Sequence, residues 1–120
     1  DKRFYMEYRS ATQFNYFYAS NGVFSVEDIS RWRMLTSTCS WSNNQARGRL
    51  YLDGYPIAES VFTTAPMAYN NQTMYIGIQY DSRVFAGSLK REFKGKIDEI
   101  RIYNRALSDN EVLSLYTVQR

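Results

Sequence analysis

The adjacent acids Asp98 and Glu99 suggest glycoside hydrolysis at first sight. That chemistry needs two carboxyl groups that face one scissile bond, about 5 to 10 Å apart. Neighbouring residues on a strand point to opposite faces, so these two carboxylates do not form that pair. We expect Asp98 to accept backbone amides and fix a strand, and Glu99 to be solvated or salt-bridged. The chain has no histidine, which removes the commonest general base. The sequence therefore favours a non-catalytic protein.

Carbohydrate binding is a second kind of chemistry that the residue types allow. It needs an aromatic face for the apolar side of a sugar ring and fixed amides or carboxylates for the hydroxyls. Three expected loops place such groups side by side: Trp41 with Asn43 and Asn44, Tyr69 with Asn70 and Asn71, and Tyr80 with Asp81. We select Trp41, Asn43, Asn44, Tyr80 and Asp81 as candidate glycan ligands. The alternative is that each is an ordinary loop residue.

Positive charge gathers in the last third of a chain whose formal net charge is +3. Lys90, Arg91, Lys94 and Lys96 are the candidate residues for binding an acidic polymer such as a sulfated or uronic polysaccharide. A solvated basic loop is the alternative. Nothing in the chain matches a nucleic-acid reading module, so no nucleic-acid partner is expected. Asn71-Gln72-Thr73 is a glycosylation sequon, which matters only in a eukaryotic secretory route.

Length and composition indicate one domain spanning residues 1–120. Of the 120 residues 44% are hydrophobic and 17% aromatic, which suits one core built from strands. No run of eighteen apolar residues is present, so no membrane insertion is expected. The N-terminus shows no charged-then-apolar leader, which is typical of a mature or partial product. A single Cys39 excludes an internal disulfide, and we expect a buried or unpaired thiol there.

Turn signals divide the chain into short strands, as in an all-β protein. The expected strands are residues 2–8, 14–18, 23–26, 32–38, 50–52, 55–63 and 73–80. Asn21-Gly22 predicts a hairpin between the second and third of these, and Asp53-Gly54 a two-residue turn between the fifth and sixth. Polar loops are expected over residues 40–47 and 64–72, and a long basic loop over 81–92. Two packed antiparallel sheets would accommodate these strands.

The organising stretch is residues 93–116, FKGKIDEIRIYNRALSDNEVLSLY. Its β-branched and aromatic residues over 97–103 predict a last strand. Ser108 and Glu111 have the spacing of a capping box, which predicts a helix over 109–116. Leu107 and Val112 can form the hydrophobic staple across that cap.

This stretch resembles the closing segment of laminin G-like (concanavalin A-like) jelly-roll domains. The hairpin Leu50-Tyr51-Leu52-Asp53-Gly54 and the strand end Met74-Tyr75-Ile76-Gly77 agree with that family in order, as does Trp32 at the start of a strand. The resemblance covers roughly residues 32–116. It implies an antiparallel two-sheet β-sandwich with a short C-terminal helix. It also implies that Trp32 lies in the core. From their turn, their backbone contacts and their cap, Asp53, Gly54, Asp98, Ser108 and Glu111 are expected to be structural as well.

The same resemblance brings calcium into consideration, because lectin-like relatives often hold Ca²⁺ at a sandwich edge through Asp, Asn and backbone oxygens. Asp28 and Asp81 are the candidate ligands, although no spaced calcium motif is present. Asp53 is explained by its turn instead. Enzymes on the related fold use a Glu-x-Asp-x-Glu run, which this chain lacks.

Domains of this type carry further strands ahead of the part that residues 1–18 resemble. We therefore expect the sequence to begin partway into the domain, with the missing strand in a longer parent chain or a partner. A register error near the N-terminus is the alternative.

The expected function is non-catalytic extracellular recognition, with edge loops of the sandwich binding a glycan or a glycosylated surface. The alternative is a structural building block of a filament, sheath or virion surface that packs on neighbouring subunits through sheet edges and aromatic surface. By resemblance the protein is secreted or surface-exposed.

Overall fold

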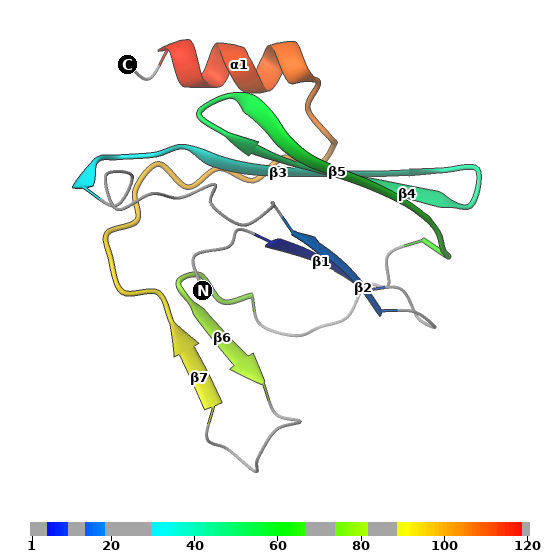
Figure 1. Cartoon of the computed structure of the whole chain (residues 1–120), viewed down its shortest axis with the longest axis horizontal. Coiled ribbons are helices and arrows are strands. Elements are labelled where there is room, and N and C mark those ends of the chain that lie inside the picture. The colour runs from blue at the N-terminus through cyan, green and yellow to red at the C-terminus, as the bar shows by residue number, and fades with distance from the viewer. Residues whose placement is uncertain (1–4, 10–13, 19–29, 67–73, 82–88, 119–120) are drawn as a thin grey trace. The chain divides into compact units, whose positions relative to one another are not determined.

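Where the structure describes it, the chain forms short antiparallel strands and one helix. The computed structural model describes residues 5–9, 14–18, 30–66, 74–81 and 89–118. The elements are β1 (Tyr5–Arg9), β2 (Phe14–Tyr18), β3 (Leu35–Ser42), β4 (Gln45–Leu52), β5 (Tyr55–Thr63), β6 (Ile78–Asp81), β7 (Leu89–Glu92) and α1 (Asp109–Val118) (Figure 1). They belong to two compact units, residues 1–68 with 103–120, and residues 69–102. Within the described residues no helix is long and apolar enough to cross a membrane.

A three-stranded sheet in the order β3-β4-β5 is the centre of the larger unit. Ser42 pairs with Gln45, so only Asn43 and Asn44 connect β3 to β4. Their φ angles of 49° and 59° are those of a two-residue hairpin turn. The polar loop expected over residues 40–47 is therefore wrong. Both asparagines tolerate the left-handed conformation, which lets the strands continue through most of that stretch.

The turn between β4 and β5 is the predicted Asp53-Gly54 pair, with φ angles of 52° and 83°. A Cβ atom on Gly54 would lie 3.1 Å from the Leu113 Cα and from the Tyr116 Cβ. Glycine is required at position 54 for two reasons. Its φ is positive, and helix α1 comes so close that a Cβ atom would have no room. Asp53 also accepts the Met34 amide at 2.9 Å and forms an ion pair with Arg33 at 2.7 Å.

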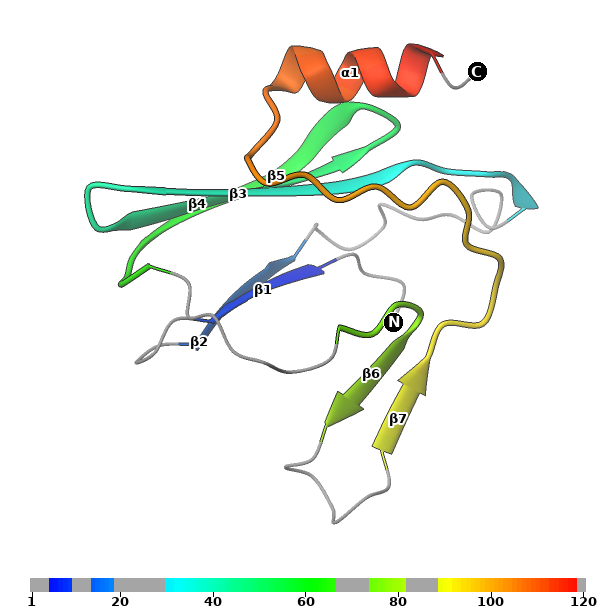
Figure 2. The same ribbon diagram turned by 180° about the vertical axis from the view of Figure 1, so that it is seen from behind.

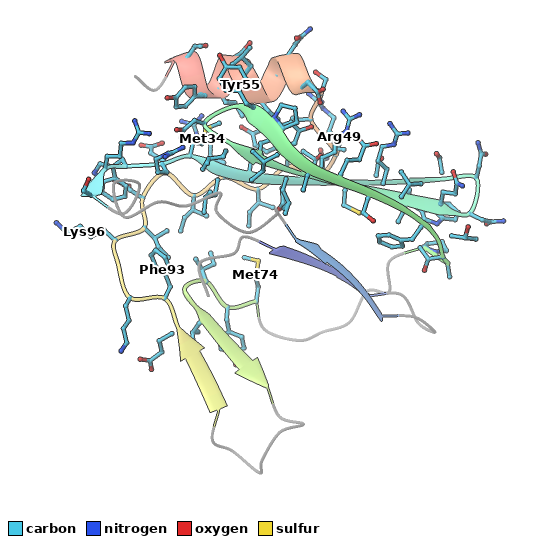
Figure 3. All side chains as sticks on the ribbon, viewed as in Figure 1. Met34, Arg49, Tyr55, Met74, Phe93 and Lys96 are labelled. Atoms are coloured by element: carbon cyan, nitrogen blue, oxygen red, sulfur yellow. The ribbon has the colours of Figure 1, made fainter. Side chains whose placement is uncertain are left out.

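Helix α1 covers one face of this sheet, and the side chains of Arg49 and Tyr51 on β4 point toward it. Tyr51 is fully buried with Leu107 and Val112, and Met34 packs against the same cluster (Figure 3). Alternate residues of a strand point to opposite faces, so Ala46 and Leu50 point away from the helix. Both are also fully buried. The central strand β4 is therefore covered on both faces.

The β1–β2 hairpin lies on the face opposite the helix, as both views show (Figure 2). Tyr5 pairs with Tyr18 and Arg9 with Phe14. β1 contacts β4, and β2 contacts β5. The expected strand over residues 23–26 lies outside the described residues. This arrangement is mostly β, with an antiparallel sheet and a C-terminal helix.

The start of α1 has the predicted capping box. The Glu111 amide donates to Ser108 Oγ at 3.3 Å, and Glu111 Oε2 accepts the Ser108 amide at 2.8 Å. Arg105 adds a forked ion pair to the same carboxylate. The Arg105 guanidinium, and then Ser108, lower the pKa of Glu111 to about 2. The helix extends two residues beyond the predicted end, to Val118.

Trp32 does not lie in the core. Its side chain is 65% exposed, because β3 begins only at Leu35. The buried aromatic position belongs to Tyr51 instead.

In the smaller unit, β6 and β7 pair antiparallel, Ile78 with Glu92 and Asp81 with Leu89. The strand expected over 73–80 begins later, at Ile78, and extends to Asp81. The basic loop expected over 81–92 is wrong at its end, because residues 89–92 form β7.

The last strand expected over residues 97–103 is absent from the described structure. Glu99 has a φ of 53°, which interrupts an extended path. Asp98 caps this bend by accepting the Glu99 amide at 2.8 Å, and Glu99 pairs with Arg101 at 3.0 Å. Ile100 and Ile102 are 55% and 70% exposed. β propensity alone does not form a strand where no described neighbour pairs with it.

Candidate functional site

The tip of the β3–β4 hairpin brings together three of the five predicted glycan residues. Trp41 lies one residue before the end of β3, and Asn43 and Asn44 form the turn. The Trp41 indole Nε1 donates to the Thr64 carbonyl at 3.0 Å, which fixes the plane of the ring. The ring is still 41% exposed. An oriented, half-open aromatic side chain therefore lies beside two exposed amides.

Thr64, which follows β5, is the residue that sequence reasoning missed. Its amide donates to the Asn44 carbonyl at 3.0 Å, while its own carbonyl accepts the Trp41 indole. One residue thus connects the turn, the ring and the end of the neighbouring strand. The Thr64 hydroxyl is buried and has no hydrogen-bond partner within the described residues. The sequence held no signal for this contact, because a hydrogen bond to a backbone carbonyl depends on no particular side chain.

The chemistry of this tip is neutral. Trp41, Asn43, Asn44 and Thr64 carry no group that titrates near neutral pH, so they provide no general acid or base. They do provide a ring face and two side-chain amides, which together offer four N–H donors and two acceptor oxygens. This donor and acceptor set suits uncharged hydroxyl groups.

Tyr80 and Asp81, the other two predicted glycan residues, lie on β6 in the smaller unit. The structure describes their backbone only. The third expected loop, with Tyr69, Asn70 and Asn71, lies outside the described residues, and so does the sequon at Asn71.

For calcium, Asp28 lies outside the described residues, and Asp81 is described only in its backbone. Among the side chains that are described, no group of three or more His, Cys, Asp or Glu could hold a metal ion. Asp53 is engaged with Met34 and Arg33.

The four candidate cations for an acidic polymer follow one another along β7 and the segment after it. Lys90 and Arg91 are on β7, where only the backbone is described, and Lys94 and Lys96 are exposed beyond it. Cys39 is a free, partly buried thiol, and this burial raises its pKa.

Comparison with known proteins indicates the family of this fold. A model of the concanavalin A-like lectin/glucanases superfamily matches residues 1–113. No curated protein matches significantly. The chain is similar to a crystal structure of residues 221–444 of an S-layer domain-containing protein from Clostridium thermocellum, with 21% identity and a TM-score of 0.58. The match covers 95% of this chain and 50% of that one, so this chain spans about half of the solved chain. At this identity the likeness shows a shared fold.

Proposed function

The chain belongs to the concanavalin A-like lectin/glucanases superfamily, and on that premise we propose that it is a non-catalytic, extracellular recognition module that binds carbohydrate. The observation that carries the proposal is the Trp41 ring, held by its bond to Thr64, 41% exposed, beside the Asn43-Asn44 turn. A fixed ring loses little conformational freedom when a sugar stacks on it. The buried Thr64 hydroxyl adds a polar group that a bound water can use to reach the ligand.

The superfamily includes both lectins and glucanases, and the local geometry favours the first class. Asp98 and Glu99 are both engaged within their own bend, with the Glu99 amide and with Arg101. A Ca²⁺ ion at Asp28 or Asp81 and an acidic polymer at Lys90, Arg91, Lys94 and Lys96 remain further parts of the proposal.

The proposal includes a two-sheet sandwich. Ala46 and Leu50 are fully buried on the face of the central sheet away from the helix, where β1 and β2 lie. A second sheet on that side would bury this apolar face along its full length.

The test is a glycan array and titration calorimetry on the native protein and on Trp41→Ala. We expect at least about a tenfold loss of affinity, from the lost ring face. Trp32→Ala is the matched control, because Trp32 is also an exposed tryptophan and precedes β3, whereas Trp41 lies near the other end of that strand. Equal binding by Trp41→Ala and the native protein, with an unchanged melting temperature, would overturn the assignment. Repeating the titration with and without Ca²⁺ tests the metal.

A structural building block is the second candidate, favoured by apolar side chains that the smaller unit leaves exposed. Met74, Tyr75, Ile76, Phe93 and Ile100 are between 49% and 65% exposed (Figure 3). The similar S-layer domain-containing protein is consistent with such a role. Light scattering with intact mass spectrometry separates the two: a stable monomer of about 14 kDa favours the binding module, and a large assembly favours the building block.

A further inference from the structure

A groove lies in the larger unit, between the segment 103–107 and helix α1. It has a volume of about 330 Å³, close to the lower end of the range for small-ligand sites. It is lined by Tyr103, Arg105, Leu107, Asn110 and Glu111, with further residues of the helix. None of these was selected from the sequence as a ligand-binding residue.

The groove combines an apolar surface with polar side chains that make no hydrogen bond to another described side chain. Tyr103 is 45% exposed, and Leu107 is buried to 8% exposure. Within the described residues, no hydrogen bond uses the Asn110 side-chain amide or the Tyr103 hydroxyl. An amide offers two donors and one acceptor oxygen, and a phenol offers one donor. The groove thus presents a ring, an aliphatic surface and unused hydrogen-bonding groups.

Charge decides which ligand suits the groove. Arg105 forms two bonds to the Glu111 carboxylate, Nη1 to Oε2 at 2.9 Å and Nη2 to Oε1 at 2.6 Å. The two charges neutralise one another, so the pair gives no net attraction for an anion. Its outer oxygens and N–H groups can still accept from and donate to hydroxyls. A neutral polyol fits this balance better than an acidic sugar.

We propose that this groove is a second saccharide site, which takes a neutral pyranose ring with its apolar side against Tyr103 and its hydroxyls toward Asn110 and the Arg105–Glu111 pair. The site is separate from the hairpin tip. Asn43 and Asn44 close one end of β4, whereas the start of α1, beside the groove, is bonded through Asp109 to Arg49 in the middle of that strand. Arg49 follows Asn44 by five residues of strand, which is roughly 16 Å. The protein would then bind a neutral glycan at two places.

The experiment is a titration of the ¹⁵N-labelled full chain with neutral cello-, manno- and galacto-oligosaccharides, with oligogalacturonate as the acidic comparison. We expect a neutral oligosaccharide to shift the amide signals of residues 103–115. Tyr103→Ala should weaken this binding about tenfold, whereas Tyr103→Phe, which keeps the ring, should retain most of it. Tyr75→Ala is the matched control, because Tyr75 is a 59% exposed tyrosine of the other unit.

A variant that changes which oligosaccharide is bound would show that the groove contacts the ligand and does not only support the fold. Glu111→Gln removes the negative half of the pair and leaves Arg105 with an unbalanced charge, so oligogalacturonate should now bind better than in the native protein. Trp41→Ala should leave the shifts of 103–115 unchanged, which separates this site from the hairpin tip. The proposal is overturned if no neutral oligosaccharide at millimolar concentration shifts these signals. It is equally overturned if Tyr103→Ala binds as the native protein does.

Discussion

The Tyr51 hydroxyl donates a hydrogen bond of 2.8 Å to Asp109 Oδ1, 58 residues later in the chain. Arg49 donates to the same oxygen at 2.6 Å, and also pairs with Glu59 on β5. Asp109 is the first residue of α1, where a carboxylate also interacts favourably with the helix dipole. The central sheet and the helix are therefore joined by hydrogen bonds to Asp109 as well as by the apolar contact of Tyr51 with Val112.

Tyr51→Phe should destabilise the protein by about 1 kcal/mol, because it removes this hydrogen bond while keeping the buried ring. Urea unfolding followed by circular dichroism measures the change. Tyr55→Phe is the control, since Tyr55 is 61% exposed. Equal stability of Tyr51→Phe and the native chain would mean that the bond contributes nothing net.

Gly54→Ala should cost about 2 kcal/mol, because alanine strains the left-handed backbone and its Cβ would lie 3.1 Å from the Leu113 Cα. Gly77→Ala is the comparison: Gly77 has a similar φ of 76°, but among the described residues an added Cβ would meet only the Ile97 Cδ1 atom, at 3.3 Å. Differential scanning calorimetry of both variants isolates the contribution of the helix contact. A smaller loss at Gly54 than at Gly77 would contradict the close packing of α1.

Acid should lower the stability of the protein between about pH 4.5 and pH 2, because contacts at the start of α1 depend on ionised carboxylates. The pKa of Glu111 is lowered from 4.5 to about 2, chiefly by Arg105, and Tyr51 lowers the pKa of Asp109. In this window the unfolded state binds more protons than the folded one, so stability rises with pH. The contribution is complete above about pH 4.5 and is lost as the pH falls toward 2.

Melting temperatures between pH 7 and pH 2 test this dependence. In Glu111→Gln the fall below pH 4.5 should become shallower, since one of the two lowered carboxyl groups is gone. A native and a variant curve with the same slope would rule out Glu111 as a source of the acid sensitivity.

Asn44→Gly should separate the two roles of the β3–β4 turn. Asn-Gly is the preferred pair for this turn, so the variant should be as stable as the native chain or slightly more so. It lacks one exposed amide of the proposed glycan site, so its affinity for carbohydrate should fall. Asn43→Ala, which strains a residue with a φ of 49°, should instead lose stability. Thermal melts and calorimetric titrations of both variants give the two readouts.

Local structure could be predicted from the sequence where a turn or a helix cap requires particular residue types. Asp53-Gly54 predicted its turn, and Ser108 with Glu111 predicted the helix start. The Asn43-Asn44 turn was missed because Asn-Asn lacks the glycine that marks such turns, although asparagine tolerates the same φ.

Tertiary context decided the predictions that were wrong. Residues 97–103 have the composition of a strand, but Asp98 stabilises a bend and no described neighbour supplies a ladder. Trp32 was placed in the core from a resemblance, yet its strand begins three residues later. At the candidate site, Trp41 and the two asparagines could be found by residue type, whereas the Thr64 contacts and the groove beside Tyr103 required coordinates.

Because Tyr51 is buried against Leu107 and Val112, its side chain can be covered only after the end of the chain has been synthesised. The whole β3–β4–β5 sheet is synthesised before these partners exist, because Val112 follows Thr63, the last residue of β5, by 49 residues. At elongation rates of about 5–20 residues per second, the nascent sheet lacks this cover for roughly 2 to 10 seconds. During this interval Tyr51 is open to chaperones and to neighbouring nascent chains, and arrival of the helix removes it from both.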